Sequence, residues 1–440
     1  MPTYPDTFAT SGRLNTRARR VMPEGTTRTT VLMDPFPIYL SHGAGCRVWD
    51  VDDQVFIDAI NNFTAMIHGH AHPDLVAAAM AQLRLGSAFG AATESEIELA
   101  ELLIGRLPSA DHIRFTNSGT EAVMMAIKAA RAATGRAKIV KIEGAYHGSY
   151  DASEVSLDST PDNWGTGQAA ANAYAHGTPA GVVHDVIVVP FNDLDALHAV
   201  LEAQGAEIAG VLIDPMPNRA GLIPARADYI HGLCDAVHAV GGLVIFDEVI
   251  TFRLGMSGAQ GLWQATPDIT VLGKIIGGGF PVGAVAGRAE VMEVFARRGG
   301  RAPVPHGGTF NANPVTMRAG IASMNALTGD EIDRINRMGD DLRDGICRAF
   351  EAAGLPGTCV GRGSLLRLHF TEKPVTDYRS VYPDAQARDR LKRFHLGLVN
   401  RGVLIGANGL MALSTAMSVE DANAVLDAAR DTLNEIAQCG

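Results

Sequence analysis

Between residues 111 and 287, short apolar runs alternate with stretches of helical periodicity. This alternation is typical of a largely parallel sheet with helices on both faces. Each run ends where polar residues or glycines begin, and ligands bind at the carboxyl ends of the strands in such sheets. We therefore look for chemistry directly after the predicted strands, which are His112–Phe115, Lys138–Ile142, Val186–Val189, Val211–Ile213, Leu243–Phe246, Ile269–Leu272 and Val282–Ala286.

A second α/β pattern follows the first, and its predicted elements are the helix Glu331–Ala353, the strand Ser364–Phe370, the helix Ala385–Arg401, the strands Val403–Ile405 and Leu410–Ser414, and the helix Val419–Ala437. Near the N-terminus, Gly45–Ile57 predicts a strand hairpin. We expect a large domain over residues 66–326 and a small domain over residues 327–440. The N-terminal segment, residues 1–65, is expected to join the small domain.

Two segments of the predicted large domain have distinctive local patterns. Thr93 and Glu96 have the spacing of a capping box at a helix start. The helix should bury one face, formed by Ile97, Ala100, Leu103 and Leu107. Residues 156–181 are rich in Asp, Pro, Gly and Asn and predict a long surface loop, a kind of segment that often covers a substrate.

Charge and cysteine content narrow the class of protein. The 440 residues include 37 Lys+Arg and 48 Asp+Glu, a net charge of −11, which argues against nucleic acid or an anionic membrane as a partner. No signal-peptide pattern and no apolar run of about 18 residues is found, so we expect a cytoplasmic location. The cysteines form no C-x-x-C pair and predict free thiols: Cys46, Cys234, Cys347, Cys359 and Cys439.

The first candidate site residues follow the strand His112–Phe115. The segment Asn117-Ser118-Gly119-Thr120-Glu121-Ala122 opens a helix. Its free amide N–H groups, two hydroxyls and a glycine that permits close backbone approach would form a cradle for a phosphate. An ordinary Ser/Thr N-cap is the alternative interpretation of the same residues.

Two charged residues follow later strands. Asp247 ends the apolar run Leu243–Phe246, and Lys274 stands 27 residues further on (274 − 247), between a strand and the glycines 277–279. A surface lysine is the alternative, but desolvation there would lower the pKa of the amine and favour Schiff-base chemistry. A phosphate cradle, a strand-end Asp and a strand-end Lys are what a pyridoxal-phosphate site requires. The carboxylate would keep the pyridinium nitrogen protonated.

The order of motifs along the chain resembles the class III aminotransferases of pyridoxal-phosphate fold type I. The resemblance covers nearly the whole chain and rests on these segments: Trp49-Asp50-Val51-Asp52, His68-Gly69-His70-Ala71-His72-Pro73, Ser118-Gly119-Thr120-Glu121-Ala122, Tyr146-His147-Gly148, Asp247-Glu248-Val249, Leu272-Gly273-Lys274 and Gly308-Thr309-Phe310-Asn311-Ala312-Asn313-Pro314. It implies a large domain with a mostly parallel seven-stranded sheet and a small α/β domain built from both termini.

The resemblance also implies roles for single residues. Lys274 is similar to the Schiff-base lysine, and Asp247 to the partner of the pyridinium nitrogen. Ser118, Gly119 and Thr120 would hold the phosphate. Tyr146 would stack on one face of the cofactor ring, with Val249 on the other. Thr309 resembles a threonine that reaches the cofactor of the neighbouring subunit, which implies a homodimer with active sites at the subunit interface.

Three histidines at positions 68, 70 and 72 could suggest a metal site. In the family that the chain resembles, this motif is a structural turn before a helix. A spacing of two residues fits no common zinc pattern. We therefore expect no metal at these histidines.

Within class III, the chain resembles glutamate-1-semialdehyde aminomutase-like proteins and, among them, the β-phenylalanine aminotransferases. Met22-Pro23-Glu24-Gly25-Thr26-Thr27-Arg28 and the short segment Asp247–Leu254 carry this resemblance. Arg28 aligns with the arginine that binds the substrate carboxylate, although a surface arginine is the alternative. Asn408 stands where the β-phenylalanine enzymes have a second, movable arginine. The residue that binds the acceptor therefore remains open, with Arg219 as one substitute.

These observations predict an aminotransferase that moves an amino group from an amino acid, expected to be a β-amino acid, to a 2-oxo acid by a ping-pong mechanism. Lys274 would act as the general base and acid. An aminomutase or an amino-acid racemase is the alternative within the enzymes. A non-catalytic protein that binds pyridoxal phosphate is a third possibility.

Overall fold

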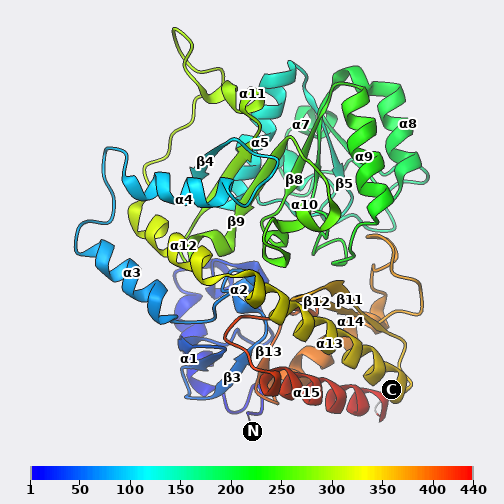
Figure 1. Ribbon diagram of the computed structural model, residues 1–440. Helices are drawn as coiled ribbons and strands as arrows, with labels where there is room; N and C mark the ends of the chain where they lie inside the picture. The colour runs from blue at the N-terminus through cyan, green and yellow to red at the C-terminus, as the bar shows by residue number, and fades with distance from the viewer. Residues whose placement is uncertain (1, 439–440) are drawn as a thin grey trace. The chain divides into compact units, whose positions relative to one another are not determined.

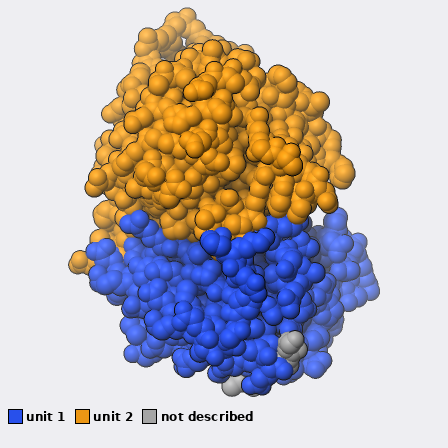
Figure 2. All heavy atoms as spheres, turned by 90° about the vertical axis from the view of Figure 1, so that its right-hand side faces the viewer, with its two compact units in different colours: residues 1–73, 333–374, 382–440 blue, residues 74–332, 375–381 orange. Residues whose placement is uncertain are grey.

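The computed structural model describes residues 2–438 (Figure 1). Cys439, one of the five cysteines, lies outside the described residues. The chain divides into two compact units (Figure 2). Unit 1 comprises residues 1–73, 333–374 and 382–440, and unit 2 comprises residues 74–332 and 375–381. The short segment 375–381 thus belongs to unit 2, although the sequence pattern places it within the C-terminal domain.

Unit 2 is built on a seven-stranded sheet. In spatial order its strands are β4 (His112–Thr116), β10 (Gly283–Gly287), β9 (Ile269–Gly273), β8 (Leu243–Asp247), β7 (Ile208–Ile213), β5 (Lys138–Ile142) and β6 (Val186–Val189). Only β10 runs antiparallel to its neighbours in this sheet. The predicted mostly parallel sheet is confirmed, and β7 starts at Ile208 rather than Val211 because Gly210 interrupts its apolar run.

Helices cover both faces of this sheet (Figure 1). On one face, α5 (Gly119–Thr134) packs its alanines against Ile139, Leu212 and Ile245. On the other face, α8 (Leu194–Gln204) and α9 (Ala227–Ala239) pack against Val140, Val211 and Phe246. Side chains alternate along a strand, so Asp247 shares the α5 face with Ile245.

The remaining helices of unit 2 are mostly short. They are α3 (Pro73–Leu83), α4 (Glu94–Ile104), α6 (Asp151–Glu154), α7 (Ala180–His184), α10 (Gly258–Trp263), α11 (Ala289–Met292) and α12 (Pro314–Ala326), with the 3₁₀ helices η3 (Gly205–Glu207), η4 (Thr251–Leu254), η5 (Lys274–Gly277) and η6 (Glu293–Phe295).

The predicted details of α4 are wrong in two respects. Thr93 is the N-cap residue, but its side chain makes no capping hydrogen bond and pairs instead with the Ser95 hydroxyl at 3.1 Å. The helix buries Ser95, Leu99 and Leu103, whereas Ile97 is 59% exposed. The apolar residues of this helix occupy more than one face, and the sequence pattern did not distinguish the face that packs.

Unit 1 joins both ends of the chain in two sheets and a set of helices. The first sheet has the order β1 (Leu40–Ala44), β2 (Arg47–Asp50), β3 (Val55–Asp58) and β13 (Val403–Leu404), and the second has the order β11 (Thr358–Arg362), β12 (Leu365–His369) and β14 (Leu410–Ala412). The helices are α1 (Ala9–Ala18), η1 (Pro23–Gly25), η2 (Thr29–Val31), α2 (Asn61–Thr64), α13 (Gly329–Ala353, mostly in this unit), α14 (Ala385–Val399) and α15 (Val419–Gln438).

The two ends of the chain share one core in unit 1. Strand β13 pairs in parallel with β3, with Val403 opposite Ile57. Phe8 and Phe56 from the N-terminal part pack with Val399 from α14. The expected α/β architecture, a large sheet-based part and a smaller part built from both termini, is confirmed. No helix within residues 2–438 has both the length and the apolar character needed to cross a membrane.

Candidate active site

A buried histidine–carboxylate pair lies at the carboxyl edge of the large sheet. Asp247 is the last residue of β8, and its Oδ2 atom is 2.7 Å from Nδ1 of His147. The second carboxylate oxygen accepts the backbone N–H of Val249 at 3.0 Å. Burial lowers the pKa of His147, while the adjacent Asp247 opposes that shift. A neutral imidazole can donate its Nδ1–H to Asp247 and so fix the orientation of the carboxylate.

The predicted phosphate cradle forms the start of α5. The Ser118 hydroxyl caps this helix by accepting the N–H of Glu121 at 3.2 Å. The Thr120 hydroxyl accepts the N–H of Ser149 at 3.3 Å, which links the cradle to the loop after β5. The ordinary N-cap interpretation is therefore correct for Ser118, and it is compatible with an anion site because the other amide groups of the first turn remain oriented outward from the helix.

Lys274 begins η5, directly after β9, in an unusual backbone conformation. Its φ angle is +51°, in the left-handed region that non-glycine residues rarely occupy. Such strain persists only where the surrounding structure enforces it, and it is common at functional sites. The side chain is half-buried at the same sheet edge as Asp247.

Close glycine contacts show that these segments meet. A Cβ atom on Gly119 would lie 3.0 Å from the side chain of Val249, which also borders Gly273, the residue before Lys274. A Cβ atom on Gly148 would lie 2.4 Å from the Thr120 hydroxyl. The cradle, the loop after β5 and the ends of β8 and β9 therefore lie close to one another at one edge of the sheet.

Sequence reasoning missed a second buried carboxyl group in this region. Asp214 directly follows β7, the neighbour of β8. Burial raises its pKa well above the ordinary value, the charge of Asp247 raises it further, and Lys274 opposes the shift. Ile213 is the register partner of Phe246, so the next residues of both strands, Asp214 and Asp247, are neighbours. A polar residue after each of two adjacent apolar strands was the signal available in the sequence.

Comparisons with known proteins agree on one family. Residues 30–436 match the profile of the family described as aminotransferase class-III. The chain is 36% identical over 430 residues to the glutamate-1-semialdehyde 2,1-aminomutase of Bacillus subtilis, a match that covers 96% of this chain and 97% of that protein.

Two solved structures are similar over almost the full chain. An omega-transaminase from Sphaerobacter thermophilus has a TM-score of 0.94 and 48% identity, and the match covers 97% of this chain and 98% of that one. A β-phenylalanine aminotransferase from Variovorax paradoxus has a TM-score of 0.87 and 32% identity, with 97% and 94% covered.

The chain belongs to the class III aminotransferase family. It is an enzyme of this pyridoxal-phosphate-dependent family, and the recognition made from the sequence motifs is confirmed. The cofactor supplies an electron sink for reactions at the substrate amino carbon. The residues of this class III enzyme fit it: glycines let the start of α5, the loop after β5 and the end of β8 approach closely. A buried carboxylate for the ring nitrogen ends β8, and Lys274 follows the neighbouring strand β9.

Two further predicted cofactor residues of this class III enzyme are exposed. The ring of Tyr146 is 49% exposed, unusual for a large side chain that directly follows a buried strand segment. Thr309 lies in an exposed loop, and Asn311 of the same loop accepts a 2.7 Å hydrogen bond from Asn117 beside the cradle. Asn311 belongs to the motif of residues 308–314, but the local pattern does not indicate its contact with Asn117.

The predicted substrate residues of the enzyme lie in different units. Arg28 belongs to unit 1, where its Nη1 donates to Asn62 Oδ1 at 2.9 Å and its guanidinium lies 5.1 Å from the Phe63 ring centre. Asn408, also in unit 1, uses its side-chain oxygen to accept the N–H of Leu410 at 3.2 Å. Arg219 belongs to unit 2, and its Nη2 is 3.7 Å from the Asp158 carboxylate.

The three histidines of the early motif have structural partners. His68 lies 2.9 Å from the Thr415 hydroxyl, and His70 is 2.7 Å from Asp58. The ring centres of His68 and His72 are 5.4 Å apart, with their planes tilted by 59°. Among the described residues, no group of three or more His, Cys, Asp or Glu side chains is arranged to hold a metal ion.

Proposed function

We propose that this enzyme transfers an amino group from a β-amino acid with an apolar substituent to a 2-oxo acid. Lys274 would link the cofactor and, once released, its Nζ would take the proton from the substrate amino carbon and return it later. Asp247, which is held in place by the hydrogen bond with His147, would pair with the protonated pyridinium nitrogen. Ser118, Gly119 and Thr120 would bind the phosphate, with Tyr146 and Val249 on the two faces of the ring.

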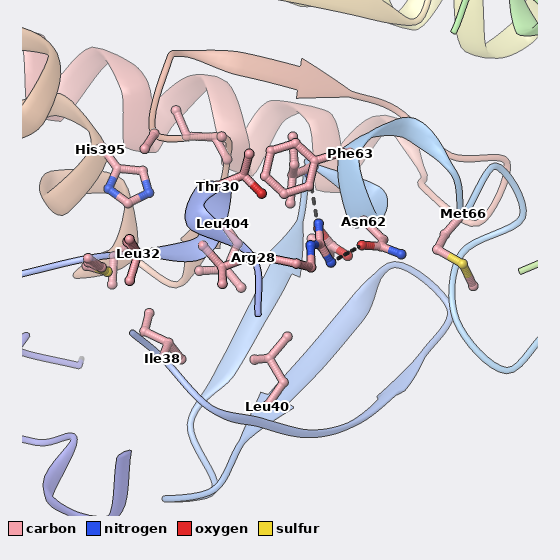
Figure 3. A pocket seen from close by; sticks show the side chains of 18 of the residues that line it. Arg28, Thr30, Leu32, Ile38, Leu40, Asn62, Phe63, Met66, His395 and Leu404 are labelled. Atoms are coloured by element: carbon pink, nitrogen blue, oxygen red, sulfur yellow. Dashed lines mark hydrogen bonds between the residues drawn. The ribbon is translucent and has the colours of Figure 1, made fainter. Parts of the chain in front are cut away.

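The observation that carries the choice of donor is a cavity within unit 1 (Figure 3). It has a volume of about 390 Å³, and Arg28 lies on its wall beside Asn62 and Phe63. Most of the other lining residues are apolar: Val31, Leu32, Met33, Ile38, Leu40, Ile60, Met66, Val399, Leu404, Ile405 and Ala407. The lining also includes Thr30, Asp58, His70 and His395, so the wall is mostly rather than wholly apolar. One guanidinium beside a mostly apolar wall suits a substrate with one carboxylate and an apolar group.

Arg28 is held in a defined orientation, which favours this role. Asn62 accepts one of its N–H donors, and the Phe63 ring supports the face of the guanidinium. An arginine has five N–H donors in a planar fork, so a fixed guanidinium can still bind a carboxylate through two parallel hydrogen bonds. A surface arginine without partners would lose more side-chain entropy on binding.

The comparisons support both amino transfer and an alternative. Two of the solved structures are described as an omega-transaminase and a β-phenylalanine aminotransferase. The Bacillus subtilis relative is described as an aminomutase, so an aminomutase is the second candidate. The mostly apolar cavity favours amino transfer from a β-amino acid with an apolar substituent. Glutamate-1-semialdehyde, from which the aminomutase takes its name, is small and polar.

The site for the acceptor involves another arginine. The side-chain oxygen of Asn408 already accepts the N–H of Leu410 within the same turn. The backbone oxygen of Asn408, in contrast, accepts a 3.0 Å hydrogen bond from Nε of Arg367. Arg367 therefore brings a guanidinium to the turn where similar enzymes have one, from the middle of an otherwise apolar strand, β12. We propose Arg367 and Arg219 as the two candidates for binding a second carboxylate of the acceptor.

We also propose that the protein forms a homodimer. One face of α3 exposes Val76, Met80 and Leu83, and the nearby residues Leu85, Phe89 and Ile97 are exposed as well. Exposed apolar residues along one face of a helix suit a subunit interface. The exposed Thr309 would then reach the cofactor phosphate of the partner subunit. The cytoplasmic location expected from the sequence stays a prediction.

Initial rates of amino transfer test the proposed function. Purified enzyme with pyridoxal phosphate is given β-phenylalanine and 2-oxoglutarate, and glutamate is measured. We expect saturable formation of glutamate, and Arg28→Gln should raise the KM for β-phenylalanine about tenfold or more with a smaller change in kcat. Arg20→Gln, a change at an exposed arginine, is the control. Isomerisation of glutamate-1-semialdehyde without transfer to 2-oxoglutarate would identify the aminomutase instead.

A further inference from the structure

A short segment of the C-terminal part of the chain is built into unit 2. Residues 375–381, which we call the clamp, belong to unit 2, while the chain on both sides of it belongs to unit 1. The clamp has its own rigid turn: the Ser380 hydroxyl accepts the N–H groups of Thr376 and Asp377 at 2.9 and 3.0 Å. Val381 packs in the core of unit 2.

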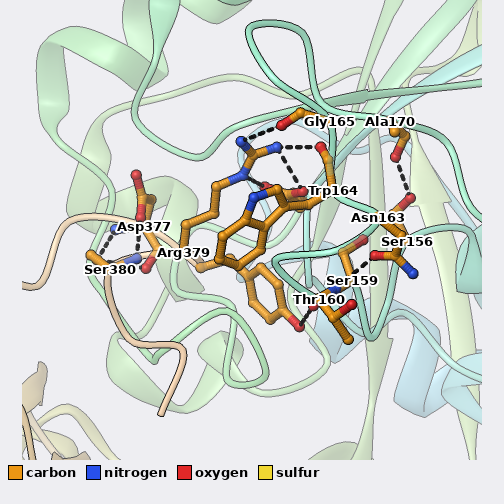
Figure 4. Close-up of polar contacts among 12 residues, drawn as sticks. Ser156, Ser159, Thr160, Asn163, Trp164, Gly165, Ala170, Asp377, Arg379 and Ser380 are labelled. Atoms are coloured by element: carbon orange, nitrogen blue, oxygen red, sulfur yellow. Dashed lines mark hydrogen bonds and ion pairs between the residues drawn. The ribbon is translucent and has the colours of Figure 1, made fainter. Parts of the chain in front are cut away.

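Arg379 is the central side chain of the clamp (Figure 4). Its Nε and Nη2 atoms donate to the two carboxylate oxygens of Glu143 at 2.6 and 3.0 Å. The same guanidinium donates to the backbone oxygens of Trp164 and Gly165 and lies 5.0 Å from the centre of the Trp164 ring. One side chain thus joins the buried end of β5 to the long loop after it.

Tyr378 holds the same two segments. Its hydroxyl donates to the backbone oxygen of Ser159 in the long loop at 2.7 Å. Its ring covers Gly144, where a Cβ atom would lie 2.1 Å from Cδ2 of the ring. Gly144 also has a φ angle of +71°, so this position favours glycine for two reasons.

Each residue between β5 and Tyr146 is therefore held by a side chain. Arg379 binds Glu143, Tyr378 covers Gly144, and the fully buried amine of Lys141 donates to the backbone oxygen of Ala145 at 3.1 Å. Lys141 also donates to the oxygen of Val155, at the start of the long loop, at 2.7 Å. Tyr146 follows directly. Its side chain is exposed, whereas residues 143–145 are buried.

We propose that Arg379 and Tyr378 are positioning residues for the cofactor: the clamp fixes residues 143–145 and so sets the orientation of the Tyr146 ring. This inference rests on the proposed stacking role of Tyr146. It also assigns the first part of the long loop, residues 156–172, as a fixed wall of unit 2, because the clamp holds it at three backbone oxygens. The sequence pattern alone predicted a long surface loop there, of a kind that often covers a substrate.

The physical basis is the free-energy cost of leaving the buried Glu143 carboxylate without Arg379. This carboxylate is almost completely buried, and burial raises its pKa while Arg379 lowers it. Asp377 raises the pKa as well, and Lys141 lowers it. Without Arg379, Glu143 must turn toward water or take up a proton. Either change releases the backbone that leads to Tyr146.

The test measures the binding of pyridoxal phosphate to the full-length protein, together with the circular dichroism of the bound cofactor. Arg379→Gln should raise the cofactor Kd about tenfold or more and weaken the dichroism signal. Arg379→Lys should be intermediate, because an ammonium group pairs with Glu143 but lacks the planar fork that reaches both backbone oxygens. Arg388→Gln is the matched control, since the Arg388 guanidinium also lies over an aromatic ring, 5.3 Å from the centre of Tyr382.

The same change in a Tyr146→Ala background separates positioning from general support of the fold. If the clamp acts through Tyr146, Arg379→Gln should change the Kd less than about twofold in that background. An equal loss in both backgrounds, or an unchanged Kd and dichroism signal in Arg379→Gln, would overturn the proposal. If Arg379→Gln does not accumulate as folded protein, Arg379→Lys and Tyr378→Phe are judged by the same criteria.

This test is independent of the donor. It uses pyridoxal phosphate alone, so inactivity toward β-amino acids would refute the proposed substrate and leave the clamp proposal standing. A wild-type protein that does not bind pyridoxal phosphate would refute both proposals.

Discussion

His147 and Asp247 are 100 residues apart in the chain (247 − 147), and their side chains meet at 2.7 Å in the interior of unit 2. Both side chains are buried. Burial lowers the pKa of His147, so the imidazole stays neutral and acts as a hydrogen-bond donor. The carboxylate of Asp247 is thereby held in a fixed orientation at the carboxyl end of β8.

Loss of the hydrogen bond between His147 and Asp247 should lower catalytic activity more than it lowers the stability of the fold. His147→Phe keeps a ring of similar shape but removes the 2.7 Å hydrogen bond to Asp247, whose other carboxylate oxygen still accepts the N–H of Val249. We expect kcat to fall about 10- to 100-fold, as for the loss of one hydrogen bond to a buried charged group. His238→Phe is a matched control, because His238 pairs with Asp268 at 2.9 Å at the other end of the same sheet. Equal loss of kcat in both variants would contradict the role of His147.

Lys274 should be essential for turnover but not for cofactor binding. Lys274→Ala removes the amine and keeps the phosphate cradle and Asp247, so the variant should retain pyridoxal phosphate and show no measurable amino transfer. Lys128→Ala, at an exposed position of α5, should behave as the wild type. Cofactor retention is followed by absorbance and transfer by product formation. Normal turnover in the Lys274 variant would refute the assignment.

Gly148 should be required because a side chain there would collide with the cradle. It has a φ angle of +87°, and a Cβ atom there would lie 2.4 Å from the Thr120 hydroxyl. Gly148→Ala should therefore disturb the cradle and weaken cofactor binding about tenfold or more. Gly177→Ala tests the backbone alone: its φ is +94°, but no atom lies within 4 Å of the added carbon. That control should lose about 1 kcal/mol of stability and keep its cofactor affinity.

Lys141 should make the stability of unit 2 depend on pH. Burial lowers its pKa from 10.5 to about 7, opposed by Glu143 and Glu154. Between these two values the unfolded chain binds a proton that the folded chain lacks, so stability rises with pH by about 1.4 kcal/mol per unit. Below about pH 7 both states are protonated, and this contribution no longer changes.

Lys141→Met removes this titration, although it also leaves the oxygens of Ala145 and Val155 without their lysine donor. The Tm of the wild type minus that of the variant should therefore increase as the pH rises through this window. Scanning calorimetry at several pH values measures the difference. A difference that is constant, or that decreases with pH, would show that the amine of Lys141 is not desolvated as described.

The sequence predicted the large sheet well because its strands are continuous apolar runs. Strands β5 and β6 have the predicted limits. Asp247 and Lys274 were predicted as site residues because they follow apolar patterns at strand ends. The face of α4 was predicted wrongly, because Ile97 and Leu99 are both apolar and only the tertiary packing shows which is buried.

Contacts between distant parts of the chain could not be predicted from local pattern. The pairing of His147 with Asp247 and the contact of Arg379 with Glu143 each join residues at least 100 positions apart. Asp214 is recognisable in the sequence as a polar residue directly after an apolar strand. Its proximity to Asp247, however, depends on β7 and β8 being neighbours in the sheet. The clamp has no such local signal, because its turn has the composition of an ordinary surface loop.

The absorbance spectrum of the purified enzyme tests the central claim most directly. β-Phenylalanine is added to enzyme loaded with pyridoxal phosphate, with no acceptor present. We predict that the band of the lysine-bound cofactor disappears while the band of pyridoxamine phosphate grows, which requires a β-amino-acid donor and transfer of its amino group. A lysine-bound band that β-phenylalanine leaves unchanged would contradict the proposed donor.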